Sequence, residues 1–483
     1  MPQGYDITIG LEVHCELNTQ TKVFCTCKNE FGGEPNNHTC PVCLGMPGML
    51  PVLNKQAVEK CITAGYATGC SINDIAHMDR KNYFYPDSPK AYQISQLYHP
   101  LCSEGIVKFE YTDEDGNVVQ SQVRIERIHL EEDAGKSIHD AWGKSSLLDF
   151  NRCGVPLIEI VTHPDIACAE QACAFFDALR SRLKFAGVSD CKMQEGSLRA
   201  DVNLSLKPVG SSELGTRTEM KNLNSVKGIF RSIKSETKRQ AEELSQGNRI
   251  IQETRRWDDS KGRSLSMRSK EEANDYRYFP DPDLAPIHVD EAWKQTLKDA
   301  LPEMPDEKKQ KYIENYNLPE YDAGILTSDP DISSFFEGSL EHTKNIKSVS
   351  NFIMGDMLRI IKEQEMEFAE VCFTSKDLAN LINFVDEGII NITTAKSTVL
   401  EAMFANEGTP SKIIESKGLK QMGNEDELLA VVREVIEENP GPVQQYKDGK
   451  QQVIGFMMGQ VMKKTQGKAK PDMVMGLIKK ELS

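Results

Sequence analysis

Residues 5–283 consist of short apolar and polar runs separated by Gly, Pro and Asn turns. In residues 6–17 every odd position is apolar or Cys, and every even position except Gly10 is polar. Because successive side chains of a strand point to opposite faces, this alternation predicts a strand with one apolar and one polar face. Together with paired charges, the pattern predicts one large α+β domain around an antiparallel or mixed sheet.

The periodicity changes after the proline-rich stretch 278–286, which stops regular structure and suits the exit from a domain. Beyond it, apolar residues recur every three or four positions, which predicts amphipathic helices at 291–300, 306–316, 347–362, 375–387, 426–438 and 451–464. The predicted organisation is an α+β domain over residues 1–292, an all-helical domain over 293–407 and a small helical tail domain over 408–483.

The 483 residues are 39% hydrophobic and 27% charged, which is typical of a soluble globular protein of several domains. No apolar run approaches the roughly 18 residues that a membrane span needs, and the amino terminus carries no export or transit pattern. We therefore expect a cytoplasmic protein that makes no membrane contact.

A net charge of −16 argues against indiscriminate nucleic-acid binding, which needs a basic surface. Residues 447–483 reverse this balance, with eight lysines against three acidic residues. A solvated helix face is the simpler explanation of the reversal, but a local contact with RNA stays open. The candidate residues for that contact are Lys463, Lys464, Lys468 and Lys470.

The thirteen cysteines are an odd number in a chain without an export signal, which favours reduced thiols over a disulfide framework. Four of them form two close pairs in a loop rich in Gly, Pro and Asn, whereas the other nine are scattered. Four thiolates arranged tetrahedrally make a closed structural Zn²⁺ site. The predicted zinc loop spans residues 25–43, with ligands Cys25, Cys27, Cys40 and Cys43.

A zinc deaminase is the competing interpretation, because His14 and Glu16 precede the pair Cys40 and Cys43. That signature places a proline before the first cysteine, where this chain has Thr39. The second cysteine pair also completes the coordination and leaves no open position for water. The sequence therefore favours the structural site.

Carboxylates and imidazoles recur on the polar faces of the predicted strands. Glu12 and His14 share one such face, as do His129 and Glu131 on another strand. Glu159 lies within the otherwise apolar run 156–161, where an unpaired buried charge would be costly and a partner is required. An ordinary half-solvated sheet explains each alternation alone but not Glu159.

Oxygen ligands with one or two imidazoles suit Mg²⁺ or Mn²⁺, the ions that neutralise phosphates during phosphoryl transfer. The sequence contains no P-loop, no dinucleotide-binding glycine motif, no nucleophile elbow and no HExxH motif. We therefore expect a metal–nucleotide site on the sheet that belongs to none of the common nucleotide-binding or hydrolase templates.

Several motifs, from end to end of the chain, resemble the B-subunit family of the aspartyl/glutamyl-tRNA amidotransferases. They are the segments 9–14, 79–87, 90–96, 129–136, 156–161, 195–199, 221–225, 275–280, 318–323 and 455–459. The resemblance implies a cradle domain with a kinase-like site, a helical domain and a tail domain that recognises the body of the tRNA.

The resemblance also implies the reaction: ATP phosphorylates the acyl group on the 3′ end of a misacylated tRNA, and ammonia displaces the phosphate. The ammonia comes from a partner amidase, the A subunit, which hydrolyses glutamine, and a small C subunit completes a heterotrimer. The implied catalytic and divalent-ion residues are Glu12, His14, Glu131, Glu132 and Glu159. Further candidates for contacts with ATP or the acceptor end are Lys81, Tyr83, Lys90, Arg199, Asp201, Lys221 and Asn224.

Glu132 fits this set least well, because strict alternation points it away from Glu131 unless the strand ends or bulges there. Two alternatives to the enzyme stay open at this point. One is a non-catalytic scaffold that binds tRNA within the same complex, and the other is a stand-alone zinc deaminase or hydrolase.

Overall fold

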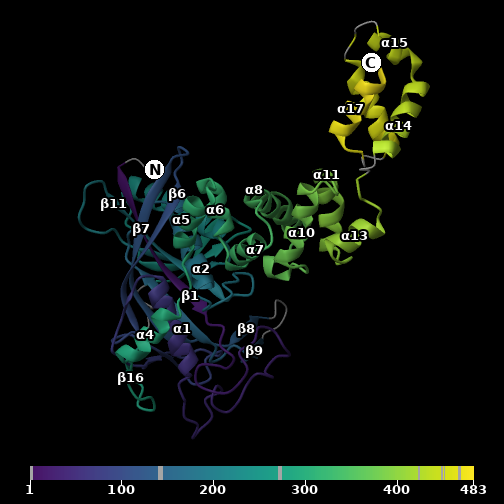
Figure 1. Cartoon of the computed structure of the whole chain (residues 1–483). Helices are drawn as coiled ribbons and strands as arrows, with labels where there is room; N and C mark the ends of the chain where they lie inside the picture. The colour runs from purple at the N-terminus through teal and green to yellow at the C-terminus, as the bar shows by residue number, and fades with distance from the viewer. Residues whose placement is uncertain are drawn as a thin grey trace. The chain divides into compact units, whose positions relative to one another are not determined.

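The computed structural model of the chain (Figure 1) divides into two compact units, Met1–Pro305 and Asp306–Ser483. It describes residues 4–139, 145–269, 275–421, 425–447, 450, 452–465 and 469–482. The first unit is mixed α+β and the second is helical, which confirms the predicted fold class. In the parts described, no helix is long and apolar enough to span a membrane.

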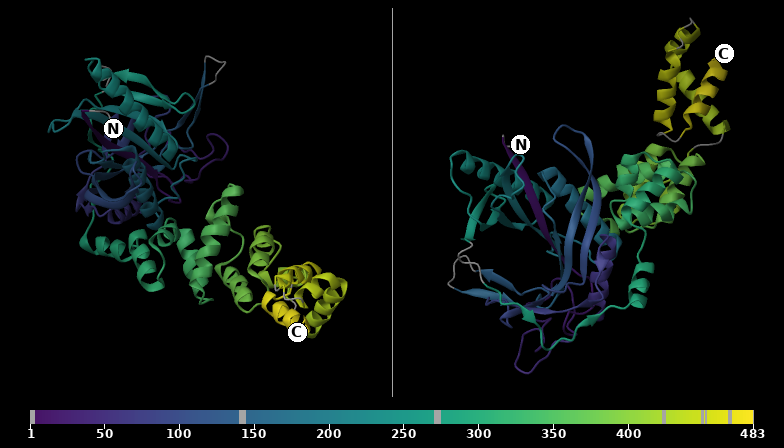
Figure 2. Two further views of the ribbon diagram at one scale, coloured as in Figure 1. Left: turned by 90° about the horizontal axis from the view of Figure 1, so that it is seen from above. Right: turned by 90° about the vertical axis from the view of Figure 1, so that its left-hand side faces the viewer.

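The first unit is built on a nine-stranded sheet in which all neighbours are antiparallel except β12 and β13. Its strands curve rather than lie flat (Figure 2). In spatial order they are β14 (Arg263–Ser269), β13 (Glu253–Asp258), β12 (Thr218–Leu223), β11 (Leu198–Pro208), β1 (Tyr5–Glu16), β10 (Pro156–Thr162), β7 (Val118–Glu132), β6 (Cys102–Thr112) and β2 (Ser71–Ile72).

Three smaller sheets complete this unit. A three-stranded sheet orders β15 (Phe279–Pro280), β4 (Asp79–Asn82) and β5 (Tyr92–Ser95). The two-stranded sheets pair β16 (Ile287–His288) with β3 (Ile75–Ala76), and β8 (Lys136–His139) with β9 (Ser146–Asp149). The proline-rich stretch thus contributes the short strand β15 before the chain leaves the sheets.

Helices pack against the apolar face of the large sheet. They are α1 (Lys55–Ala67), α2 (Ala169–Phe185) and α3 (Val226–Ser245), and each has an N-cap side chain that accepts a backbone hydrogen bond. The odd-numbered residues Ile9, Leu11 and Val13 of β1 are fully buried in the same core. The predicted apolar face of this strand is therefore confirmed.

Helix α4 (Glu291–Asp299) also packs on this unit, through the indole of Trp293, whose Nε1 donates to Glu59 at 3.1 Å. Leu297 of the same helix contacts the core. These contacts explain why the first unit extends to Pro305, whereas the sequence pattern placed the boundary after residue 292.

The second unit contains two separate hydrophobic cores. The first includes Tyr312, Phe336 and Ile413, and the second includes Leu428 and Leu482. Its helices are α5 (Pro305–Tyr316), α6 (Glu320–Leu326), α7 (Pro330–Leu340), α8 (Ile346–Asn351), α9 (Leu358–Glu363), α10 (Ser375–Asp386), α11 (Ile392–Thr394), α12 (Leu400–Phe404), α13 (Pro410–Ser416), α14 (Glu425–Glu438), α15 (Pro440–Lys447), α16 (Val453–Lys464) and α17 (Pro471–Leu482).

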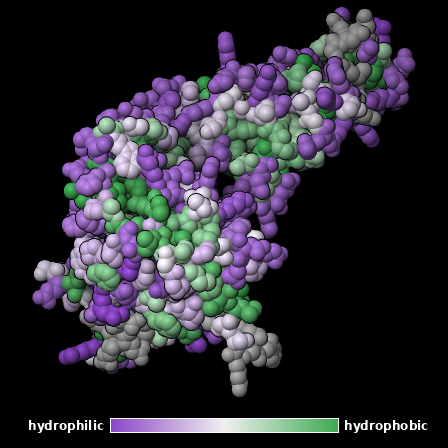
Figure 3. All heavy atoms as spheres, turned by 90° about the horizontal axis from the view of Figure 1, so that it is seen from below, coloured by the Kyte–Doolittle hydropathy of each residue, from purple (hydrophilic) through white to green (hydrophobic). Residues whose placement is uncertain are grey.

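Among the helices of the first of these cores, two segments are π-helical, Phe352–Met357 and Ala395–Val399, and one is 3₁₀-helical, Phe368–Glu370. Helix α13 contributes Ile413 and Ile414 to that core, although the sequence pattern assigned residues from 408 onward to the tail. On the face of the molecule drawn in Figure 3 most side chains are hydrophilic, and apolar ones gather in a few patches.

Candidate active site

The polar face of the large sheet gathers the predicted carboxylates and imidazoles through its cross-strand register. His14 of β1 lies opposite Glu159 of β10 on one side and Arg199 of β11 on the other. Glu159 in turn lies opposite His129 of β7. Because directly opposed residues have Cβ atoms about 5 Å apart, this register brings residues that are distant in sequence into one site.

The first cluster consists of His14, Glu131 and Glu159, whose potential ligand atoms all lie within 4.8 Å of one another. Nε2 of His14 and Nε2 of His129 each lie 3.4 Å from Oε2 of Glu159. The hydroxyl of Ser95 donates to Glu131 at 3.0 Å. The partner that Glu159 requires is therefore a pair of imidazoles.

The charged groups in this cluster shift one another's pKa values. Burial disfavours the imidazolium of His129, but Glu159 and Glu131 outweigh this effect and raise its pKa to about 9. Burial likewise opposes the ionised form of Glu159, yet the two imidazoles hold its pKa well below the usual range. Within the described residues, the buried Nδ1 atoms of His14 and His129 have no hydrogen-bond partner.

The second cluster is Glu12, Asp201 and Glu219, again with potential ligand atoms within 4.8 Å of one another. Asn203 donates to Glu12 at 2.9 Å, and the ammonium of Lys221 lies 2.6 Å from Asp201 and 2.9 Å from Glu219.

Burial, followed by the charge of Glu159 and of Glu219, raises the pKa of Glu12. A divalent cation would relieve this crowding of carboxylates.

The donor sets of both clusters suit a hard divalent cation. The second cluster offers carboxylate oxygens alone, and the first adds the imidazole of His14. Mg²⁺ and Mn²⁺ prefer such ligands, and the unpartnered Nδ1 of His14 leaves that ring available to an added group. The residues present therefore fit a divalent cation in either cluster.

Glu219 was missed by the sequence analysis, although the alternation of residues 218–221 puts it and Lys221 on one face. It lies opposite Asn203 across β11 and β12.

Glu132 does not join either cluster. Its carboxylate accepts hydrogen bonds from the ammonium of Lys90 and from the backbone N–H of Ile94, the latter at 2.9 Å. Glu131 and Glu132 thus point to different partners at the end of β7, as strict alternation predicts, yet both are buried. The structure separates Glu132 from the four other residues with which the family resemblance grouped it.

Cationic side chains flank the first cluster. Burial disfavours the charged form of Lys81, but Glu131, Tyr278 and Glu159 together raise its pKa. Its ammonium lies 5.0 Å from the ring centre of Tyr276, which also contacts Tyr83 edge to face at 6.3 Å. The predicted residues Lys81 and Tyr83 therefore lie at the same edge of the site.

Arg199, opposite His14, is held by a carboxylate that the sequence analysis missed. Its Nη atoms lie 3.2 and 3.3 Å from Asp133, which is buried. Burial raises the pKa of Asp133, but Arg199 and Arg152 outweigh it and lower the pKa to about 2. Desolvation and the neighbouring Asp133 raise the pKa of Glu16 to about 8.

Asn224 lies exposed in the turn between β12 and α3. A cavity of about 410 Å³ adjoins Glu12 and is lined by Gly10, Asn203 and the segment 214–217 among others. A second cavity, of about 820 Å³, includes Tyr5 and Ile7 and so lies on the opposite, helix-covered face. Of these two, the smaller one therefore opens beside the carboxylates.

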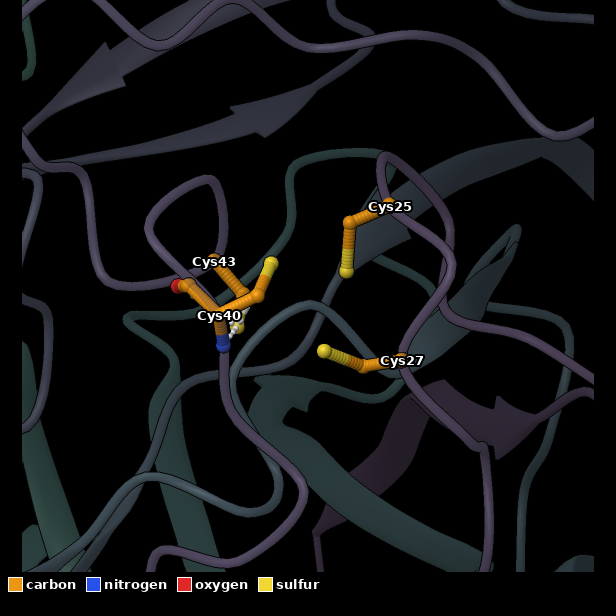
Figure 4. A group of neighbouring side chains, drawn as sticks. All are labelled: Cys25, Cys27, Cys40 and Cys43. Carbon is orange, nitrogen blue, oxygen red and sulfur yellow. Dashed lines mark hydrogen bonds between the residues drawn. The ribbon is translucent and has the colours of Figure 1, made fainter.

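The four predicted zinc ligands converge (Figure 4), with their Sγ atoms within 4.8 Å of one another. The backbone N–H of Cys40 donates to Sγ of Cys43 at 3.1 Å. Lys22 is fully buried, and its ammonium donates to the carbonyl of His38 at 2.6 Å and lies 4.0 Å from Sγ of Cys43. Four thiolates around Zn²⁺ would carry two net negative charges, one of which this buried cation offsets, so the residues fit a structural zinc site.

The deaminase arrangement is wrong for this chain, because His14 groups with Glu131 and Glu159 and not with the cysteines. The four thiols complete a closed set in its place.

The tail lysines fall into different settings. Lys464 of α16 pairs with Glu434 and Glu438 at 2.8 and 2.7 Å. Lys463 is exposed on the same helix, Lys470 is half-buried, and Lys468 lies outside the described residues.

The chain matches the GatB/GatE catalytic domain over residues 7–295 and the GatB domain over residues 334–482. It is 53% identical over 481 residues to the B subunit of the aspartyl/glutamyl-tRNA(Asn/Gln) amidotransferase of Caldicellulosiruptor saccharolyticus, with 99% of both chains covered. The B subunits of the same enzyme from Thermoanaerobacter pseudethanolicus and Lachnospira eligens are 52% and 51% identical, and at least 99% of each chain is covered. The chain therefore belongs to the family of aspartyl/glutamyl-tRNA(Asn/Gln) amidotransferase B subunits.

Proposed function

We propose that this chain uses ATP to activate the side-chain carboxylate of an aspartyl or glutamyl group attached to tRNA, and that ammonia then converts this group to the amide. The observation that carries the proposal is the polar sheet face, where two carboxylate clusters lie beside Lys81, Arg199 and Lys221. A tRNA scaffold needs no such concentration of carboxylates and cations, whereas phosphoryl transfer does.

The proposed reaction has two steps. A carboxylate oxygen of the aminoacyl group attacks the γ-phosphorus of ATP, the bond from that phosphorus to the bridging oxygen breaks, and ADP leaves. Ammonia then attacks the acyl carbon, the bond to the phosphate oxygen breaks, and inorganic phosphate leaves with the proton lost from nitrogen. The phosphate makes a leaving group of an oxygen that ammonia could not otherwise displace.

The residues of this chain act on the charge that develops. Lys81 and Arg199 keep their positive charge, because neighbouring carboxylates raise the pKa of each, and so they can stabilise phosphate oxygens. Lys221 is similarly stabilised by Asp201 and Glu219. Glu131 and Glu159 with His14, or Glu12 with Asp201 and Glu219, would hold a divalent cation, which would supply further positive charge at the phosphates. Excluding water protects the acyl phosphate from hydrolysis.

We assign the remaining features by the same reasoning. The thiol quartet holds a structural Zn²⁺, and the helical tail contacts the body of the misacylated tRNA through Lys463 and Lys470. The amide nitrogen comes from glutamine, hydrolysed by a partner amidase A subunit in a heterotrimer with a small C subunit. The relatives are named as B subunits, which supports a complex of several different chains.

The experiment that tests the proposal measures ATP turnover and amide formation on glutamyl-tRNA and aspartyl-tRNA with the reconstituted complex. Ammonium replaces glutamine, so the amidase step is bypassed. We expect Glu12→Gln and Glu159→Gln to lower both activities about 100-fold or more, because each removes a charged group from the reacting site. Glutamine hydrolysis, measured separately, stays intact.

Glu104→Gln is the matched control, since this carboxylate lies exposed on β6 of the same sheet. Full activity in the control and loss in both site variants supports the proposal. Unchanged activity in Glu12→Gln and Glu159→Gln would move the phosphorylation to another chain of the complex and leave this one as the tRNA-binding scaffold.

A further inference from the structure

The chain just after the zinc loop contacts Lys90, whose partner Glu132 directly follows Glu131 of the first cluster. Gly45, which lies two residues after the last cysteine of the quartet, has a left-handed backbone with φ of +62°. A Cβ atom built on it would lie 2.5 Å from Cγ of Lys90 and 3.2 Å from its Cα. The loop backbone therefore lies directly against the stem of this lysine, at a distance that leaves no room for a side chain.

The head of Lys90 is held as closely as its stem. Its ammonium pairs with the carboxylate of Glu132 and lies 5.6 Å from the ring centre of Phe24 and 5.3 Å from that of Tyr92. Phe24 directly precedes the first cysteine of the quartet. A lysine side chain normally retains much rotamer freedom, so contacts from both sides restrict it to one position.

Two backbone hydrogen bonds form a second connection between the chain before the zinc loop and the site. The backbone N–H of Val23 donates to the carbonyl of Gly154 at 2.8 Å, and the N–H of Gly154 donates to the carbonyl of Asp133 at 3.0 Å. Asp133 is the partner of Arg199. The residues that flank the zinc loop on both sides therefore contact Lys90 itself and the backbone that carries Asp133, the partner of Arg199.

Hydrogen bonds of His38 with Lys22 and Asn151 hold the loop before the second cysteine pair, and the turn that carries Gly45 follows this pair. Over residues 29–54, all of them described, the chain forms no helix or strand. The turn itself has short-range backbone bonds, from Leu44 to Cys40 at 3.0 Å and from Gly45 to Val42 at 3.0 Å. A metal ion bound by all four cysteines would join this turn rigidly to the Cys25–Cys27 segment, and so to Phe24.

We infer that the zinc loop is a positioning device for the activation step, in which the metal-bound quartet clamps Lys90 against Glu132. Lys90 is then the residue through which metal occupancy affects the reaction, while Gly45 and Phe24 act as positioning residues. This inference rests on the proposed function, because it requires Lys90 to contribute to the activation of the aminoacyl group.

The test uses two glycines in the turn that follows the zinc loop. Gly45 and Gly48 both have left-handed backbones, with φ of +62° and +84°, so Ala brings similar backbone strain to each. Of the two, Gly45 alone contacts Lys90, since a Cβ atom on Gly48 has nothing within 4 Å. The complex with Gly45→Ala or Gly48→Ala is assayed for bound zinc, for kcat and KM of ATP in the ammonium-dependent reaction, and for tryptophan fluorescence.

We expect Gly45→Ala to retain its zinc and its fluorescence but to lose about 10- to 100-fold in kcat/KM, because a displacement near 1 Å costs about that much. Gly48→Ala retains full activity. Lys90→Met, which keeps the stem and removes the charge, loses a similar factor, and adding Gly45→Ala to it causes no further loss.

Removal of zinc by a chelator tests whether the metal, too, acts through Lys90. It lowers the activity of the wild-type complex and leaves the residual activity of Lys90→Met unchanged. Equal activity of Gly45→Ala and Gly48→Ala, or additive losses in the double variant, overturns the inference. If Lys90→Met is fully active the inference also fails, while loss of activity in Glu159→Gln in the same assay shows that the proposed function survives.

Discussion

Replacing Asp133 by Asn probes the charge balance beside the candidate active site. Asp133 is buried, and it accepts hydrogen bonds from Arg199 while lying 3.5 Å from Nε of Arg152. Glu16 shares this environment, with a pKa raised to about 8 by desolvation and by the charge of Asp133. The substitution keeps the shape of the side chain and removes one charge, so its effect reports the electrostatics directly.

The magnitude follows from the two pKa shifts. Folding lowers the pKa of Asp133 from 3.8 to about 2. The ionised carboxylate therefore contributes about 2 kcal/mol at every pH above 3.8, and this contribution is lost as the pH falls from 3.8 through 2. The ionisation of Glu16 has the opposite effect on the free energy of unfolding. Its folded pKa of about 8 exceeds the unfolded value of 4.5, so each pH unit between these values lowers stability by about 1.4 kcal/mol.

Asp133→Asn should therefore destabilise the protein by about 2 kcal/mol near pH 5, where the penalty from Glu16 is still small. As the pH rises toward 8, Glu16 ionises more readily in the variant, because the repelling charge is gone and the two arginines need a partner. The penalty in the wild type keeps growing over this range. The difference in stability between variant and wild type should thus shrink by more than about 1 kcal/mol from pH 5 to pH 8.

Urea unfolding followed by tryptophan fluorescence measures this difference. The three tryptophans, Trp142, Trp257 and Trp293, all precede residue 306 in the sequence, so the unit Asp306–Ser483 contributes no tryptophan signal. In a Glu16→Gln background the same substitution should cost about 2 kcal/mol at both pH values. A loss that is equal at pH 5 and pH 8 with Glu16 present would refute the assigned coupling.

Three further predictions concern other parts of the chain. Phe336→Ala, at a fully buried position, should cost the helical unit about 3–5 kcal/mol, seen as a lower thermal midpoint in circular dichroism while the fluorescence midpoint stays unchanged. Cys27→Ser should remove one bound zinc per chain, measured by elemental analysis, and retention of full zinc would contradict the four-thiolate site. Lys463→Ala should weaken tRNA binding and lower its salt dependence by about one ion, whereas Lys464→Ala, whose ammonium already pairs with two glutamates, should have a smaller effect.

Local periodicity predicted the main elements of the fold, because it reports which face of an element is buried. The alternation of residues 6–17 corresponds to β1, and the spacing at 375–387 corresponds to α10. The same pattern could not assign α4 to a unit. This helix has an apolar stripe like its neighbours, and only the contacts of Trp293 and Leu297 with the sheet unit place it there. Membership of a unit is a tertiary property that spacing does not encode.

The candidate site, too, was predicted only as far as local sequence patterns reach. The two-residue alternation was enough to place Glu12 and His14 on the polar face of their strand. The cost of burying a lone carboxylate indicated that Glu159 needs a partner. What the sequence could not supply is register. Irregularities interrupt the pairing of β11 with β12 and of β10 with β7, so counting along one strand does not tell which residue lies opposite.

Glu219 was missed because the sequence did not show that its strand lies beside β11, and Asp133 because it follows the end of β7, although each completes a constellation that was otherwise anticipated. Glu132 is the opposite case, a residue that was predicted in the site but lies outside both clusters. The family resemblance grouped it with Glu131, but Lys90 and the backbone of Ile94 hold its carboxylate elsewhere. Chemistry on a sheet face is therefore decided by which strands are neighbours. The residue types show that a charged site exists, and the register determines which charges face one another.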